Sequence, residues 1–137
     1  MALSASDILK AEDIEIASVD VPEWKNSNGD STVHIKALTG LERDDYECSV
    51  FMTDDKAKSP AERRKNFRAQ LLVRAIVSAD GVPMFTVKDI DALGRKSGKA
   101  LDRCYEVATR LSGMSKSDQQ EILKNSNADQ SGDSSTA

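Results

Sequence analysis

The chain has 137 residues, a length typical of one domain, and its 19 Lys and Arg side chains against 23 Asp and Glu give a formal net charge of −4. This balance disfavours a generally basic nucleic-acid binder. No apolar run approaches the roughly 18 residues that a transmembrane helix needs, and residues 1–10 lack the basic flank and apolar stretch of a secretory signal.

Two cysteines are too few for a disulfide framework. Cys48 and Cys104 each lie in a predicted helix, so we expect both to be buried, reduced thiols of a cytoplasmic protein.

Charge is divided unevenly along the chain. Residues 1–55 hold 4 basic and 13 acidic side chains, whereas residues 56–124 hold 15 basic and 8 acidic ones. An acidic front and a basic back can attract each other within one molecule or between copies. Self-association is therefore one expectation, and an ordinary solvated surface that happens to segregate its charge is the alternative.

The first part of the chain predicts a β-hairpin. Residues 4–10 could form a short helical turn. Residues 14–21 alternate apolar and polar side chains but change phase midway, which predicts a strand with a bulge or bend. Pro22 ends this strand, Asn28-Gly29-Asp30 is a turn signal, and residues 32–38 form a second strand. Because an isolated hairpin is marginally stable, we expect helices or another copy to cover its apolar face.

Helix start signals repeat after the hairpin. Ser or Thr followed three residues later by an acid is a capping box, in which each side chain accepts a hydrogen bond from the other residue's backbone N–H. Such boxes begin at Thr39, Ser59 and Thr86, and Ser97 precedes a further apolar stripe at helical spacing. The predicted helices cover residues 39–52, 59–78, 86–94, 97–111 and 117–124.

Residues 125–137 contain only alanine as apolar content, too little to offset the entropy lost on ordering, so they are expected to be disordered. The sequence thus predicts one α+β domain at residues 1–124. It consists of an N-terminal antiparallel β-hairpin followed by four or five α-helices, with a disordered C-terminal tail at residues 125–137.

The sequence shows no pattern of a catalytic, cofactor or metal site. His34 is the single histidine and forms neither a metal cluster nor an evident triad. Residues 94–99 imitate a phosphate loop but have the wrong glycine spacing, and residues 127–132 imitate only the start of a calcium loop. We therefore expect a protein that is not an enzyme and needs no cofactor and no metal.

Two segments of the chain resemble tail assembly chaperones of long-tailed, siphovirus-like bacteriophages or prophages. The first joins Asp20-Val-Pro-Glu-Trp24 to residues 33–43, Val-His-Ile-Lys-Ala-Leu-Thr-Gly-Leu-Glu-Arg. The second covers residues 79–97, followed by residues 100–103 and 110–115. The single motifs are short, but their order and spacing over residues 5–120 are similar to those of the family.

The resemblance implies a chaperone that coats the tape-measure protein in the cytoplasm of the bacterial host and helps to recruit the major tail protein. It also implies that the protein leaves before the tail is complete and is absent from the mature virion. Two rival functions stay open: a structural minor tail or head–tail connector protein of the virion, and a small DNA-binding regulator.

The sequence also predicts residues that contact a partner. Trp24, the sole tryptophan, either folds back onto the sheet or contacts a partner. Residues 56–74 hold seven basic residues and one acid, but Asp102 and Glu106 on a following helix would repel the phosphates of DNA, so a protein contact or a solvated face is favoured. The predicted contact residues are Trp24, Leu38, Leu41, Arg63, Arg64 and Arg68. We expect Trp24→Ala to leave the fold intact and to weaken partner binding.

Overall fold

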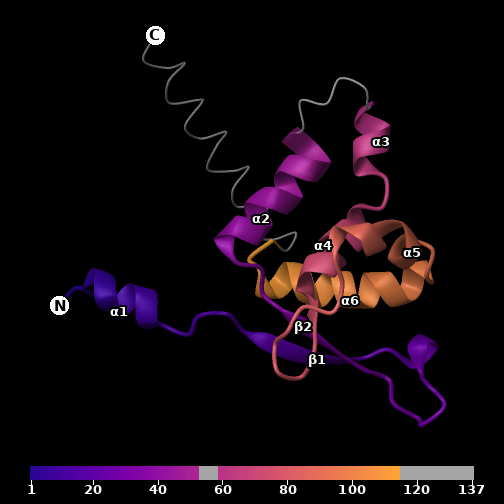
Figure 1. Ribbon diagram of the computed structural model, residues 1–137, viewed down its shortest axis with the longest axis horizontal. Coiled ribbons are helices and arrows are strands. Elements are labelled where there is room, and N and C mark those ends of the chain that lie inside the picture. The colour runs from indigo at the N-terminus through magenta and orange to yellow at the C-terminus, as the bar shows by residue number, and fades with distance from the viewer. Residues whose placement is uncertain (53–58, 115–137) are drawn as a thin grey trace, which may run out of the picture.

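The computed structural model describes residues 1–52 and 59–114 (Figure 1). The helix predicted at residues 117–124 and the disordered tail predicted at residues 125–137 lie outside the described residues, so both stay predictions, as does the domain boundary at residue 124. No helix in the described ranges is long and apolar enough to cross a membrane.

The predicted hairpin is present, formed by β1 (Ile16–Asp20) and β2 (Thr32–Lys36). The two strands pair antiparallel without interruption from Ile16 opposite Lys36 to Asp20 opposite Thr32, so the predicted bulge is wrong. The phase change has a simpler cause. Ile16 lies on the opposite face of the strand from buried Val19 and stays 43% exposed.

A third strand, β3 (Ile76–Val77), pairs antiparallel with β2, so the sheet order is β1-β2-β3. The sequence predicted one helix through residues 59–78. The structure instead has α3 (Pro60–Arg64) and α4 (Phe67–Ala75). Asn66 separates them in a left-handed conformation with φ of 60°, which asparagine tolerates better than most residues.

Five α-helices follow the hairpin in the described residues, which confirms the α+β class. All three predicted capping boxes are formed, and Ser97 caps the last helix by accepting a hydrogen bond from the Ala100 N–H. The remaining elements are α1 (Ala5–Lys10), the 3₁₀ turn η1 (Pro22–Trp24), α2 (Gly40–Glu47), the π-helical turn η2 (Cys48–Met52), the 3₁₀ turn η3 (Val87–Asp89), α5 (Ile90–Gly94) and α6 (Gly98–Leu111).

The core lies between the sheet and the helices. α6 packs on β1 and β2, while α4 packs against α6 and α5 (Figure 1). Fully buried side chains come from each layer: Val21, Ile35, Leu71, Leu72 and Cys104. Burial of Cys104 confirms its prediction. Cys48, the first residue of η2, is exposed, so its predicted burial is wrong. α1 has no buried residue and projects from the body (Figure 1).

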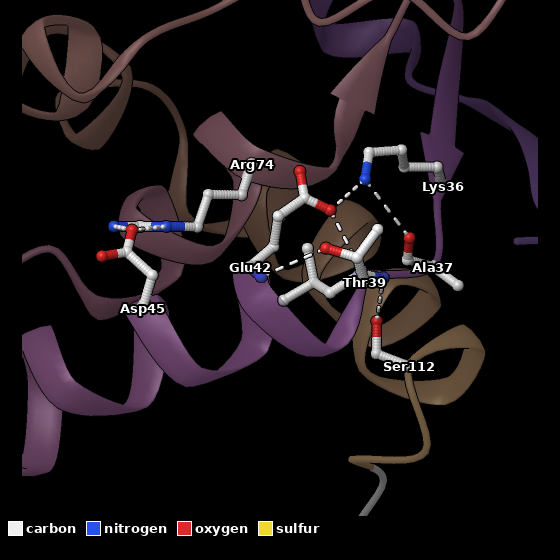
Figure 2. A network of polar contacts seen from close by, with 8 residues as sticks. Lys36, Ala37, Thr39, Glu42, Asp45, Arg74 and Ser112 are labelled. Atoms are coloured by element: carbon white, nitrogen blue, oxygen red, sulfur yellow. Dashed lines mark hydrogen bonds and ion pairs between the residues drawn. The ribbon is translucent and has the colours of Figure 1, made fainter. Parts of the chain in front are cut away.

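A polar junction joins β2 to α2. Lys36 is buried, and its Nζ forms an ion pair with Glu42 and lies 3.5 Å from the carbonyl oxygen of Ala37 (Figure 2). Glu42 also accepts a hydrogen bond of 3.0 Å from the Thr39 N–H, as the acid of the capping box. One carboxylate therefore both starts α2 and neutralises the buried ammonium group.

Two further contacts fix α2 against the other helices. The Leu38 N–H donates to Ser112 Oγ at 2.9 Å, which ties the entry of α2 to the end of α6. The Arg74 guanidinium on α4 forms an ion pair of 2.7 Å with Asp45 on α2 (Figure 2). Contacts with strand β2, with helix α4 and with the end of helix α6 thus set the position of α2.

Candidate functional site: apolar hollows on the surface

The residues singled out in the sequence for chemistry have ordinary surroundings. His34 Nδ1 lies 3.2 Å from Ser18 Oγ across the hairpin. Burial raises the pKa of the Cys104 thiol to about 11, so this thiol is protonated at neutral pH. Within residues 1–52 and 59–114, no group of three His, Cys, Asp or Glu side chains could hold a metal ion.

Two hollows share Trp24 and Phe85 as lining residues, and we call them the Trp24 hollows. Their volumes are about 440 and 370 Å³. The larger hollow is also lined by Ala92, Leu93 and the charged residues Glu23, Lys25, Asp89 and Lys96. The smaller hollow is also lined by Thr32, Val33, His34, Ile76, Val77, Ser78 and Met84. Apolar walls with charged residues around them are typical of protein-binding surfaces.

Trp24 is held in place by the turn that carries it. Pro22 starts η1, where its fixed φ suits the first helical position, and the Trp24 N–H donates to the carbonyl of buried Val21 at 3.0 Å. Glu23 forms an ion pair of 2.7 Å with Arg103, which anchors η1 to α6. The indole ring therefore lies partly buried against the core while still lining both hollows.

The segment that contributes Phe85 adds exposed apolar surface. Val82, Met84 and Val87 are 59%, 59% and 60% exposed. Such a concentration of exposed aliphatic side chains marks a surface for a partner more often than scattered single residues do. Its signal in the sequence is the apolar run Val82-Pro-Met-Phe85, which has neither helical nor strand periodicity and was not predicted as a contact.

A third hollow, of about 690 Å³, lies between η2, α3, α4 and α6, and we call it the Arg64 hollow. Phe67 and Tyr105 meet edge to face in it, with ring centroids 5.6 Å apart. The other lining residues are Val50, Phe51, Ala61, Glu62, Arg64 and Lys65. The hollow is thus aromatic and aliphatic, with two cations and one acid among the residues that line it.

The three apolar residues predicted as contacts lie in different places. Trp24 lines the Trp24 hollows. Leu38 is only 8% exposed and belongs to the core, so it offers little surface to a partner. Leu41 is 81% exposed on the first turn of α2 and lines neither set of hollows.

Two of the three predicted arginines lie around the Arg64 hollow. Arg64 lines it, and the Arg68 guanidinium lies 4.5 Å from the centroid of the Phe67 ring while pairing with Asp102. A cation over an aromatic face is a favourable contact that also orients the ring. Arg63 belongs to α3, but its side chain lies outside the described part of the structure.

Comparison with known proteins gives the family. Residues 7–125 match the phage tail assembly chaperone family. No curated protein matches the chain. Among solved structures, the chain is similar to the tail assembly chaperone of bacteriophage HK97, with 19% identity and a TM-score of 0.54 over 77% of this chain and 94% of that chain, a likeness of fold. Because the family match covers most of its length, the chain belongs to the phage tail assembly chaperone family.

Proposed function

We propose that the protein binds the tape-measure protein of a long-tailed bacteriophage and helps to recruit the major tail protein during tail assembly. It does so in the cytoplasm of the bacterial host, by protein–protein contact without catalysis or cofactor, and does not remain in the mature virion. The observation that carries the proposal is the family match over residues 7–125.

The Trp24 hollows supply a surface that suits this client. In this proposal the client offers hydrophobic helical segments, as the resemblance implies. An amphipathic helix places apolar side chains at three- and four-residue spacing, which shallow apolar hollows accept. Tryptophan combines a large apolar surface with a polar N–H and is often a dominant contact. The mixed charges of Glu23, Lys25, Asp89 and Lys96 beside the larger hollow favour a reversible complex over a permanent core-like one.

Copies of the chain also associate with one another along the client in this proposal. The support is the charge division between the acidic residues 1–55 and the basic residues 56–124. Opposite charge on two parts of one chain brings successive copies together at a rate and affinity that salt reduces.

Co-expression with the tape-measure protein tests the proposal. The client should become soluble and co-purify with several copies of this chain. Met84→Ser should weaken client binding by about tenfold, because Met84 is 59% exposed in the smaller Trp24 hollow and loses a buried apolar contact. Trp24→Ala should weaken binding further. Contrary to the expectation from the sequence, it should also lower stability, because Trp24 packs against the core.

Leu41→Ser is the matched control. The sequence predicts Leu41 as a contact, but Leu41 is 81% exposed and lies outside the Trp24 hollows, so in this proposal Leu41→Ser binds the client like wild type. Equal client affinity in wild type and in all three variants would contradict the assignment of the surface. A client that stays insoluble with nothing bound would contradict the function itself.

The two rival functions have separate signatures. A minor tail or connector protein would be present in purified particles, where the chaperone is absent. A DNA-binding regulator would bind duplex DNA with an affinity that falls steeply as salt rises, because it releases counterions from the phosphates.

A further inference from the structure

We propose that residues 1–15 of one copy, here called the N-terminal arm, dock in the Arg64 hollow of a second copy. The inference rests on the self-association proposed above and names the two surfaces that produce it. Its consequence is a head-to-tail contact, in which every copy has one arm to give and one hollow to fill.

The arm carries apolar side chains that nothing covers in the single chain. Every residue from Met1 to Ile16 is exposed, including Leu3 at 73%, Ile8 at 58% and Leu9 at 86%. Helices as short as the six residues of α1 are marginal in water and are normally stabilised by packing an apolar face against a neighbour. A partner surface would supply that packing.

The capping box of α1 arranges these side chains. Ser4 and Asp7 cap each other, with a hydrogen bond of 3.0 Å from the Ser4 N–H to the Asp7 carboxylate. Leu3 is the residue before the cap, and Ile8 is the fourth residue of the helix. Side chains at these two positions lie on the same side of a helix start, and Leu9 follows Ile8 directly. The arm therefore presents a small aliphatic surface.

The Arg64 hollow has the volume of a binding pocket and an apolar, partly aromatic lining that suits aliphatic side chains. Its volume of about 690 Å³ lies within the usual range of binding pockets, about 300–1,000 Å³. Phe51, which lines it, is 56% exposed, so an occupant would cover an aromatic ring that now faces solvent.

The charges are complementary as well. The arm holds four acids, Asp7, Glu12, Asp13 and Glu15, and one base, Lys10. Arg64 and Lys65 are exposed at the hollow, whereas the acid there, Glu62, already accepts a hydrogen bond from the Ser59 N–H as part of a capping box. An acidic, aliphatic segment is thus a better occupant than a basic one.

A second copy is favoured over the arm's own hollow. Figure 1 shows α1 projecting from one side of the molecule and α3, which lines the hollow, on the other. Because arm and hollow are different surfaces, the contact is heterologous and can continue from copy to copy as a ring or an open filament.

Sedimentation velocity of the purified full chain, without any client, tests the proposal. Wild type should form larger species as its concentration rises, and less so in high salt. The arm variant Ile8→Ser/Leu9→Ser and the hollow variant Arg64→Glu/Lys65→Glu should each associate at least about tenfold more weakly, from loss of buried aliphatic surface or of charge attraction. Mixing the two variants should restore association, but only as far as a heterodimer, since one intact arm and one intact hollow remain.

Leu41→Ser is the matched control and should associate like wild type. Circular dichroism should show that both double variants stay folded, because all four changed side chains are exposed. Monomers at all concentrations, unchanged association in the variants, or failure of the mixture to form a heterodimer would each overturn the proposal. An arm variant that fails to self-associate yet still binds the tape-measure protein would leave the proposed function standing, so the two can fail separately.

Discussion

The ion pair between Lys36 and Glu42 gives a sharp test of how the sheet is joined to α2 (Figure 2). The side chains of Lys36 and Glu42 are 10% and 27% exposed. Glu42→Gln removes the negative charge but keeps an oxygen that can accept the hydrogen bond from the Thr39 N–H. The change therefore isolates the charge of the pair from the capping of the helix.

The expected loss follows from the burial of the lysine that remains. Removing one partner of a buried ion pair costs about 3–5 kcal/mol, because the other charge is left uncompensated. Lys36 keeps some solvent contact and a neighbouring carbonyl oxygen on Ala37, so we expect Glu42→Gln to lower the free energy of unfolding by about 2–3 kcal/mol. Lys36→Met should cost about 1 kcal/mol or less, since Glu42 remains partly exposed and hydrogen-bonded.

Urea unfolding at neutral pH, followed by the fluorescence of Trp24 and by circular dichroism, measures both losses. The double variant Lys36→Met/Glu42→Gln should be more stable than Glu42→Gln alone, because it leaves no charge without a partner. A loss for Glu42→Gln of less than about 0.5 kcal/mol, the size expected of an exposed pair, would refute this reasoning. So would equal losses for the two single variants.

The same pair predicts a dependence on pH. Burial raises the pKa of Glu42, but hydrogen bonds from Lys36 and from Thr39 outweigh it and hold the pKa below the ordinary value of 4.5. A carboxyl whose pKa is lower in the folded state contributes stability that is present above the unfolded pKa and is lost as the pH falls through the folded one. Wild type should therefore lose more stability than Glu42→Gln between neutral pH and strongly acidic pH.

Two further predictions concern glycine packing and the cysteines. Gly94→Ala should lower the free energy of unfolding by about 1–3 kcal/mol, because the new methyl group would meet the Asn66 side-chain amide. A methyl group at Gly98 would meet no atom within 4 Å, so Gly98→Ala should leave Tm unchanged or slightly higher. Equal Tm values for the two variants would count against this packing. Cys48 should react quickly with a thiol reagent in the folded protein, and Cys104 only on unfolding, because Cys104 is buried and its pKa is raised to about 11. Simultaneous labelling of both thiols under native conditions would be inconsistent with this burial.

The helix starts could be predicted because their signals are local. The capping boxes at Thr39, Ser59 and Thr86 need only four consecutive residues, and all three are formed. Gly113, which follows the C-cap residue Ser112 of α6, adopts a φ of 69° that glycine accepts without strain. The hairpin was predictable for a similar reason, since alternation and turn residues lie close together in the sequence.

The interruption at Asn66 and the early end at Ala75 of the helix predicted at residues 59–78 could not be predicted from neighbouring residues in the sequence. Ile76 continues the apolar helical spacing of α4, yet it pairs with Ile35 of β2, a residue far away in the sequence. Pairing with a strand that is distant in the sequence can override a local helical pattern. It does so more readily at β-branched residues such as isoleucine, which fit strands better than helices. Asn66 likewise leaves the helix in a conformation stabilised by its hydrogen bond of 3.0 Å to Asp91 on α5.

The surface was the least predictable part. A hollow is made by side chains from several elements, so Phe85 beside Trp24 and Phe51 beside Arg64 become visible only once the chain is folded. Trp24 and Arg64 were predicted as contacts because an aromatic in a polar loop and a basic run are conspicuous in a sequence. The folded chain assigns them to different hollows.

This separation matters for how the two proposals combine. The Trp24 hollows and the Arg64 hollow share no lining residue, so one copy can hold the client and a neighbouring copy at once. Each docked neighbour then raises the effective concentration of the next client contact, and weak single contacts add up along the client. The arm variant Ile8→Ser/Leu9→Ser should therefore lose more affinity for a long tape-measure segment than for one short enough to bind a single copy. Equal losses for both lengths would mean that the copies bind the client independently.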